Sequence, residues 1–304
     1  RNIWLLGLVS FFCDVSTEMV YPLIPLYLVS SFGATPALVG IIEGIAESLA
    51  SLLKVFSGYA SDKFKRKKPI AFAGYSTAII YKLALILSTS WVGILTARVI
   101  DRIGKGVRTA PRDVLVAENA QAGKLGNAFG LHKALDMAGS ALGILLAFFL
   151  LKGSKGEFNY KFVFIISIIP SIIGLCILSM VKENKVERPV KKKENLIAGF
   201  KQLDTRLKLF LLVAFVFTLG NSSNTFLLLR AQNVGFDATN VILLYFIYNL
   251  VSSIFALPLG KLSDKIGRKK LLVAGYISFS IVYLGFALAT NKITIILVFI
   301  LYGI

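Results

Sequence analysis

The sequence has 304 residues, 56% of them hydrophobic and only 16% charged, with a mean hydropathy of +0.75. A soluble domain carries about a quarter charged residues, whereas apolar stretches long enough to cross a hydrocarbon core of about 30 Å recur along this chain. The formal net charge is +18. The basic residues lie between apolar stretches, which indicates the positive-inside bias of membrane proteins and disfavours nucleic-acid binding. The composition therefore predicts an all-α, polytopic membrane protein.

Ten transmembrane helices are predicted from the apolar stretches and the charged or Gly/Pro breaks between them. In chain order they cover residues 3–30, 37–60, 69–89, 92–112, 125–151, 160–181, 207–230, 239–260, 270–290 and 293–304. The tenth is about half a span long. Cys13 and Cys176 lie singly in apolar stretches and predict no disulfide framework. Pro22, Pro25 and Pro258 fall inside predicted helices, where proline favours kinks.

Basic residues are concentrated in alternate connections, and most of them lie in residues 63–68, 182–208 and 261–270. This asymmetry predicts a cytoplasmic N-terminus in the cell inner (plasma) membrane. Residues 182–206 are predicted to be a basic cytoplasmic linker. The linker separates an N-terminal six-helix bundle, residues 1–181, from a C-terminal bundle, residues 207–304, that is truncated in its tenth helix.

A short pattern with the spacing Gly-x3-Asp-x3-Arg-Lys-Lys occurs twice, at a constant offset of 202 residues. Its positions are Gly58, Asp62 and Arg66 in the first copy and Gly260, Asp264 and Arg268 in the second. Glycine permits close helix approach, and an aspartate can face a helix N-terminus. A stop-transfer cluster would explain the basic residues but not the repeated Gly and Asp. The pattern therefore indicates an internal repeat of two helical halves.

The two copies resemble the loop motif of the major facilitator superfamily, found between helices 2 and 3 and again between helices 8 and 9. The second copy includes Gly267, whereas the first has Lys65 where a glycine is usual. Residues 98–106 resemble the family's fourth-helix motif, and the run to Asp113 resembles a little-characterised prokaryotic branch. Gly139-x3-Gly143 is similar to the motif of proton-driven antiporters, with Ile144 replacing the usual proline.

The resemblance implies a major facilitator fold with two pseudo-symmetric six-helix halves, of which about ten of twelve helices are present and the second half is incomplete. It implies a secondary active transporter that moves a small organic solute by alternating access. We expect proton coupling and export of drug-like or cationic compounds; an organic-anion or nutrient carrier is the alternative. A channel or membrane enzyme is disfavoured, because metal-ligand spacing, a nucleophile motif and a phosphate loop are all absent from the sequence.

Acidic residues inside predicted helices are the candidate proton-coupling groups, because ionisable side chains are costly within a membrane and mark functional sites. Asp14 and Glu18 lie one turn apart on the first helix, and Glu43 and Glu47 repeat this spacing on the second. A carboxylate in a partly dry cavity can exchange a proton or hold a cationic substrate.

Structural roles remain open for the same acids. Asp14 or Glu18 would then neutralise Arg98 or Arg102, and Glu43 and Glu47 would pair with Lys54 or Lys82. A buried ion network is expected from Asp101, His132, Lys133 and Asp136. The lone histidine is either a satisfied structural residue or a proton relay.

Substrate binding is expected from polar and aromatic residues that interrupt apolar helices: Tyr21, Arg98, Arg102, Asn221, Asn224, Tyr245 and Asn249. The polar run Asn221 to Asn224 needs partners, which are either a substrate in a water-filled cavity or neighbouring helices. The expected partners are a small-molecule substrate, protons and the lipid bilayer, with no nucleic acid. The protein is expected to be a monomer without cofactor, metal or catalytic residue.

Overall fold

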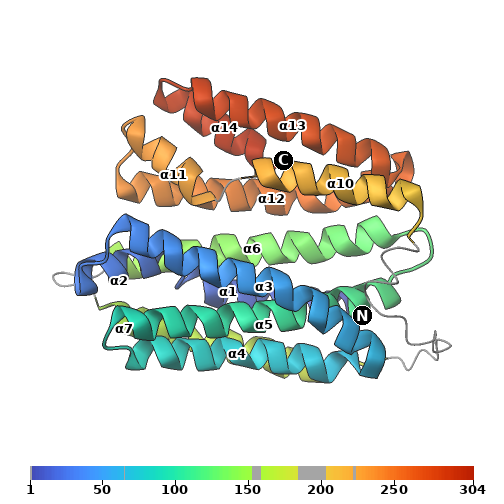
Figure 1. The fold of residues 1–304 in the computed structure, drawn as a ribbon, viewed down its shortest axis with the longest axis horizontal. Helices are drawn as coiled ribbons and strands as arrows, with labels where there is room; N and C mark the ends of the chain where they lie inside the picture. Colours follow the sequence, from blue (N-terminus) through green and yellow to red (C-terminus); the bar gives the residue numbers. More distant parts are fainter. Residues whose placement is uncertain (1, 65, 153–158, 184–202, 222–223) are drawn as a thin grey trace.

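The computed structural model of the protein describes residues 2–64, 66–152, 159–183, 203–221 and 224–304. Within these residues the regular structure is entirely α-helical (Figure 1). The predicted linker falls largely on residues 184–202, which lie outside the described residues. The all-α class predicted from composition is confirmed.

The helices of the first half are α1 (Asn2–Glu18), α2 (Leu23–Phe32), α3 (Pro36–Phe64), α4 (Lys67–Leu87), α5 (Trp91–Glu118), α6 (Leu125–Lys152), α7 (Tyr160–Ile166) and α8 (Ile168–Met180). Those of the second half are α10 (Thr205–Gly220), α11 (Asn224–Asn233), α12 (Ala238–Ile266), α13 (Arg268–Leu288) and α14 (Lys292–Gly303). The halves lie side by side, with α6 along α12 (Figure 1). Within the first half, α1 packs against α6 and α8, and α5 packs against α3 and α4.

Two of the predicted single helices are interrupted at prolines, so their continuity was wrongly predicted. In the first, α1 ends at Glu18 and α2 begins at Leu23. Pro22 has no N–H to donate to the carbonyl of Glu18, and a helix cannot continue unchanged through it. In the sixth, α7 and α8 are separated at Ser167, three residues before Pro170, for the same reason.

A third interruption corresponds to the first in the internal repeat. The seventh predicted helix breaks where α10 ends at Gly220, and the next helix begins at Asn224. The offset of 202 residues places Met19, which follows α1, opposite Asn221, which follows α10. Irregular backbone at membrane depth is tolerated only where it lies within protein or lines a water-filled cavity. Both halves therefore carry a break that indicates a polar interior.

Among the described residues, five helical stretches are long and apolar enough to cross a membrane: Lys67–Leu87, Leu125–Leu150, Tyr160–Met180, Asn240–Ile266 and Arg268–Leu288. Along α13, Ile277, Ile281, Leu284 and Leu288 are each more than half exposed, as expected of a stripe that faces lipid. The chain is thus a multi-pass membrane protein. In contrast, α5 is 28 residues long but rich in charged residues, and these residues form most of the site described next.

Candidate functional site

Ion pairs between oppositely charged side chains join α3 to α5. We call this group the arginine cluster; it consists of Glu43, Glu47, Arg98, Asp101 and Arg102. Arg98 donates from Nε and Nη2 to the two carboxylate oxygens of Glu43, at 2.7 and 2.5 Å. Its Nη1 donates to Asp101 at 3.2 Å, and Arg102 Nε lies 3.3 Å from Glu47. Arg98 is completely buried. A buried charge requires such pairing and hydrogen bonding, so the cluster holds α3 against α5.

The ion pairs of the arginine cluster show which acids lie in direct contact with its arginines. The arginines of α5 take their carboxylates from α3 and from α5 itself, not from α1. The acids of α3 consequently pair with arginines and not with Lys54 or Lys82. Lys82 instead donates to Ser171 Oγ at 3.0 Å and to the Ala78 carbonyl at 3.1 Å. Helix packing is the reason: α5 lies along α3, whereas α1 packs mainly on α6 and α8.

Tyr21 lies in the break between α1 and α2, beside the arginine cluster. The centroid of its ring is 5.2 Å from Cζ of Arg98 and 5.9 Å from Cζ of Arg102, both within the range of a cation–π contact. Three of the predicted substrate residues are therefore brought together. Both sides of the Arg98 guanidinium group are already occupied by carboxylates, so an anionic ligand would have to displace Glu43 to reach it.

Glu18 is the last residue of α1 and lies between the arginine cluster and the second half. Its Oε2 atom is buried and has no hydrogen-bond partner among the described residues. Lys105 and the two arginines of α5 act on it electrostatically. From the other half, the phenol group of Tyr245 on α12 interacts with both Glu18 and Tyr21. A buried carboxylate oxygen without a partner marks a place where a proton, a ligand or water completes the site.

Asp14 of α1 and Asp136 of α6 act on each other electrostatically, and we call them the aspartate pair. Lys133 Nζ lies 2.9 Å from Asp136 Oδ2. The Lys133 side chain is 53% exposed and that of Asp136 is 14% exposed. Asp136 is therefore close to the protein surface, with one ammonium group as its direct counter-charge.

The residues of the predicted ion network, Asp101, His132, Lys133 and Asp136, do not share one set of ion pairs. Asp101 belongs to the arginine cluster, and Lys133 belongs with the aspartate pair. His132 makes no ion pair in the described part of the chain; its Nε2 lies 2.9 Å from Ser10 Oγ. Asp101 is set apart from the three residues of α6 because α6 packs on α1 and α12, whereas α5 packs on α3 and α4.

The polar residues predicted to bind substrate in the second half meet a group of tyrosines. Tyr283 donates to Asn221 Oδ1 at 3.4 Å, and Tyr302 donates to Asn224 Oδ1 at 3.0 Å. Asn249 is buried and donates to the Tyr245 carbonyl at 2.8 Å. Tyr248 stacks between Tyr245 and Tyr302, with centroid distances of 6.0 and 4.9 Å. The intervening Ser222 and Ser223 lie outside the described residues.

The second copy of the loop motif joins the two halves. The carboxylate of Asp264 on α12 accepts the backbone N–H groups of Gly126 and Asn127, each at 2.8 Å, at the first turn of α6. An acid in this position caps the helix and complements its dipole. Side-chain atoms at Gly126 or Gly260 would overlap the facing backbone, so glycine permits the contact.

The other residues of the two motif copies do not take part in this contact between the halves. Gly267 has φ +90° between α12 and α13, a conformation that favours glycine. Arg268 and Arg66 are exposed at the starts of α13 and α4, and Gly58 faces Ala110 of α5. The side chain of Asp62 and all of Lys65 lie outside what the structure describes.

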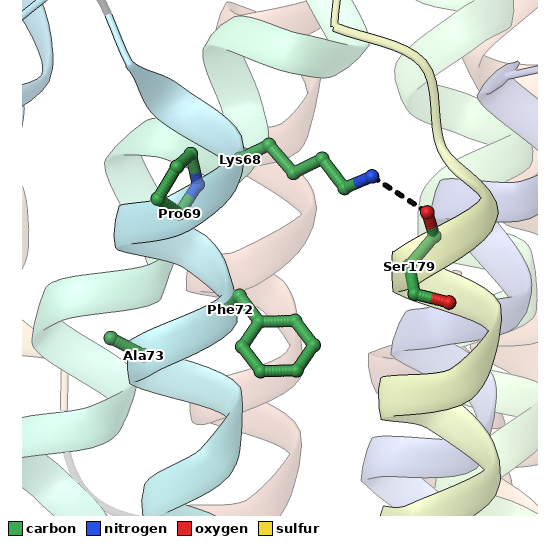
Figure 2. Close-up of a pocket in the computed structure, with 5 residues that line it drawn as sticks. All are labelled: Lys68, Pro69, Phe72, Ala73 and Ser179. Atoms are coloured by element: carbon green, nitrogen blue, oxygen red, sulfur yellow. Dashed lines mark hydrogen bonds between the residues drawn. The ribbon is translucent and has the colours of Figure 1, made fainter.

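A groove of about 390 Å³ lies between α4 and α8, away from both charged groups (Figure 2). Lys68, Pro69, Phe72, Ala73 and Ser179 line it, and Lys68 Nζ donates to the Ser179 carbonyl at 2.6 Å. Its lining includes none of the predicted site residues. Among the described residues no group of three or more His, Cys, Asp or Glu side chains is arranged to hold a metal ion.

A multi-pass helical protein with two repeated halves, broken first helices and paired charges inside the bundle is a membrane transporter of the repeat-built class. The comparison with known families agrees: residues 6–304 match the Major Facilitator Superfamily. The chain belongs to the major facilitator superfamily, as the loop motif predicted. Members of this family are transporters and not enzymes.

Similar proteins extend this assignment. An uncharacterized MFS-type transporter of Methanocaldococcus jannaschii is 39% identical over the whole chain, which spans 76% of that protein. The multidrug resistance protein MdtG of Salmonella typhimurium is 25% identical over 91% of the chain and 70% of its own length. The crystal structure of the human organic anion transporter MFSD10 (TETRAN) superposes with a TM-score of 0.72 at 14% identity, covering 100% of this chain and 82% of that one. The last similarity is one of fold.

Several residues around the site were not predicted from the sequence. Tyr283 and Tyr302 contact the predicted asparagines, and Arg108 and Arg112 act on the aspartate pair from α5. The many positive charges of α5 in the sequence could have indicated a role for these two arginines. The two tyrosines carry no comparable signal, since tyrosine is common in membrane helices.

Proposed function

We propose that the protein is a proton-coupled secondary active transporter that exports drug-like or cationic organic compounds by alternating access of its two halves. The observation that carries this proposal is Glu18, whose buried Oε2 atom has no hydrogen-bond partner among the described residues. Ionisable groups within membrane spans mark substrate and proton pathways. A carboxyl group that takes either a proton or a cation couples their movements, because each excludes the other.

The proposed substrate site lies between Glu18 and the second half. Tyr21 and Tyr245 supply aromatic faces near this acid, and Asn221 and Asn224 supply amide groups at the break after α10. Aromatic faces with few polar groups suit a lipophilic cation. The name of the relative MdtG, a multidrug resistance protein, favours the same substrate class.

We assign Asp14, Glu43 and Glu47 to the proton pathway together with Glu18. The side chains of Glu43 and Glu47 are 29% and 53% exposed, so both acids stay partly accessible while they pair with arginines. Protonation of either acid would weaken its ion pair and loosen α3 from α5. We propose that Arg98 and Arg102 respond to these acids, and that Arg102 also borders the substrate.

The proposed movement is a rocking of one half against the other about the contact of α6 with α12. Asp264 closes this contact at the first turn of α6, and Ser253 Oγ donates to the Ala134 carbonyl at 2.8 Å further along it. We further propose that the N-terminus is cytoplasmic in the plasma membrane and that the protein acts as a monomer.

The test uses vesicles that contain the protein and hold an acid-interior pH gradient reported by a fluorescent dye. Lipophilic cations are added first, and organic anions second. The proposal predicts that cations discharge the gradient, that Glu18→Gln abolishes the response, and that the exposed-site control Asp204→Asn preserves it. Discharge by anions alone would contradict cation export and favour an organic-anion carrier. A cation response that survives Glu18→Gln would overturn the role of Glu18.

A further inference from the structure

The groove between α4 and α8 lies at one edge of the membrane-spanning region. The apolar stretch of α4 begins at Lys67 and that of α7 and α8 ends at Met180, and the groove lies next to both of these ends. Phe72 in its lining is 40% exposed and Met180 is 57% exposed, as expected of apolar side chains that face lipid. Lipid headgroups meet the acyl chains at the ends of membrane spans, so the groove can contact both parts of one lipid.

Lys68 supplies a positive charge to this groove. Its Nζ atom donates to the carbonyl of Ser179 at 2.6 Å, and Figure 2 shows the side chain reaching from α4 to α8, with the ring of Phe72 pointing the same way one turn further along. An ammonium group has three donors, and this bond uses one. The neighbouring Lys67 is paired with Glu118 at 2.7 Å, whereas Lys68 forms no ion pair with a described residue. The charge of Lys68 is therefore available to an anion.

Glu183 is the acid beside Lys68, and its carboxylate is occupied by the backbone of α4. It accepts the N–H groups of Lys67 at 2.6 Å and of Lys68 at 3.4 Å, and so caps the first turn of the helix. Arg66 precedes α4 in the chain, Lys182 precedes Glu183, and both basic residues are exposed. The basic residues at this end of the groove outnumber the acid, so its rim is positively charged.

We propose that this groove binds one phospholipid whose headgroup carries a net negative charge. Lys68 contacts the phosphate, and one acyl chain lies along the apolar lining formed by Pro69, Phe72 and Ala73. The Ser179 carbonyl is among the last four of α8 and has no partner within its own helix, so it holds the ammonium group between the helices. The bound lipid links the start of α4 to the end of α8. Charge complementarity favours an anionic lipid over a zwitterionic one.

The internal repeat provides a matched control position. The offset of 202 residues places Lys270, at the start of α13, opposite Lys68. Lys270 is exposed, and the position equivalent to Phe72 is Ala274, which has no ring to line a groove. Removing the charge of Lys270 therefore changes the net charge of the protein equally without touching the proposed lipid site.

Native mass spectrometry of the purified protein in detergent tests the proposal, with dioleoylphosphatidylglycerol as the anionic probe and dioleoylphosphatidylcholine as the zwitterionic one. The anionic lipid is expected to bind more tightly. Lys68→Gln should weaken its binding about 5-fold, which corresponds to about 1 kcal/mol for one basic residue, and Lys270→Gln should not. Ala73→Trp fills the groove from an exposed position and keeps Lys68, so it replaces Lys68→Gln if that variant fails to fold. Unchanged binding in either groove variant would overturn the proposal.

Phosphatidylglycerol with a photoreactive group in one acyl chain tests where the lipid lies. Labelling is expected at residues 69–73 of α4 and in the last turn of α8. Labelling confined to residues 184–202 would show that this segment meets the lipid in place of the groove. Equally tight binding of inorganic phosphate would show a site for simple anions. Either result would overturn the lipid site. Because no substrate or pH gradient is used, these outcomes do not depend on the proposed function.

Discussion

Arg98 of α5 and Glu43 of α3 form a two-pronged ion pair, with nitrogen–oxygen distances of 2.7 and 2.5 Å. The arginine side chain is completely buried, whereas 29% of the glutamate side chain is exposed. The acid is therefore partly accessible, whereas the guanidinium group is not. This difference in exposure suits an acid that changes its protonation state while the arginine remains charged. It also predicts that the stability of the fold depends more on Arg98 than on Glu43.

Replacing Arg98 with methionine is expected to lower the free energy of unfolding by about 3–5 kcal/mol, because Glu43 and Asp101 would lose their buried partner. Thermal unfolding of the purified protein in detergent measures the change. The control Arg206→Met removes an exposed arginine and should change stability by less than about 0.5 kcal/mol. Equal melting temperatures for the two variants would show that the buried pair contributes little.

Asp264→Asn should weaken the contact between the halves, because an amide caps the first turn of α6 without a negative charge. The expected effect is a population shift towards longer distances between spin labels at the exposed positions Lys124 and Lys265, measured by pulsed electron spin resonance. Asp237→Asn is the matched control, since Asp237 precedes α12 and makes no side-chain cap bond to it. An unchanged distance distribution in Asp264→Asn would argue against this latch.

Gly139→Ala should destabilise the protein by about 1–3 kcal/mol, because the added methyl group would overlap the main chain of Phe11. Gly275→Ala is the matched control: no atom outside its own helix lies near the added methyl group, so stability should stay equal or rise by about 0.4–1 kcal/mol. Thermal unfolding compares the two variants, and equal destabilisation would contradict the close packing of α1 on α6.

Asn224→Ala should raise the apparent KM for an exported cation about 2–10-fold, the loss expected from one hydrogen bond of about 0.5–1.5 kcal/mol. Initial rates at increasing cation concentration in vesicles measure the change. Asn240→Ala, at an exposed position on α12, should leave KM unaltered. A lower maximal rate with an unchanged KM would mean that Asn224 holds helices together and does not bind substrate.

The fold was largely predictable because its signals are local. The lengths of the apolar stretches predicted the membrane-spanning helices. The motif with Gly260 and Asp264 predicted both the internal repeat and the family. The breaks in the first helix of each half were less visible. Pro22 predicted a kink but not where α1 ends, and the break at Asn221 depends on partners such as Tyr283, which lies 62 residues away in the sequence.

Partners within the site were less predictable, because pairing depends on which helix faces which. The sequence placed acids and bases on the correct helices. It could not show that Arg98 faces Glu43 of α3, or that Asp136 pairs with Lys133 on its own helix. Helical periodicity gives the spacing of residues on one face but not the neighbour of that face. The choice among several carboxylates therefore required the packing of α1, α5 and α6.

The central claim is that Glu18 couples protons to an exported cation, and Glu18→Gln in liposomes tests it most directly. Two quantities are compared for tetraphenylphosphonium as the probe: exchange at equal pH on both sides, and accumulation driven by a pH gradient. The account predicts that the variant keeps exchange but loses gradient-driven accumulation, whereas the wild-type protein and Asp204→Asn show both. Accumulation by Glu18→Gln at the wild-type level would contradict the account.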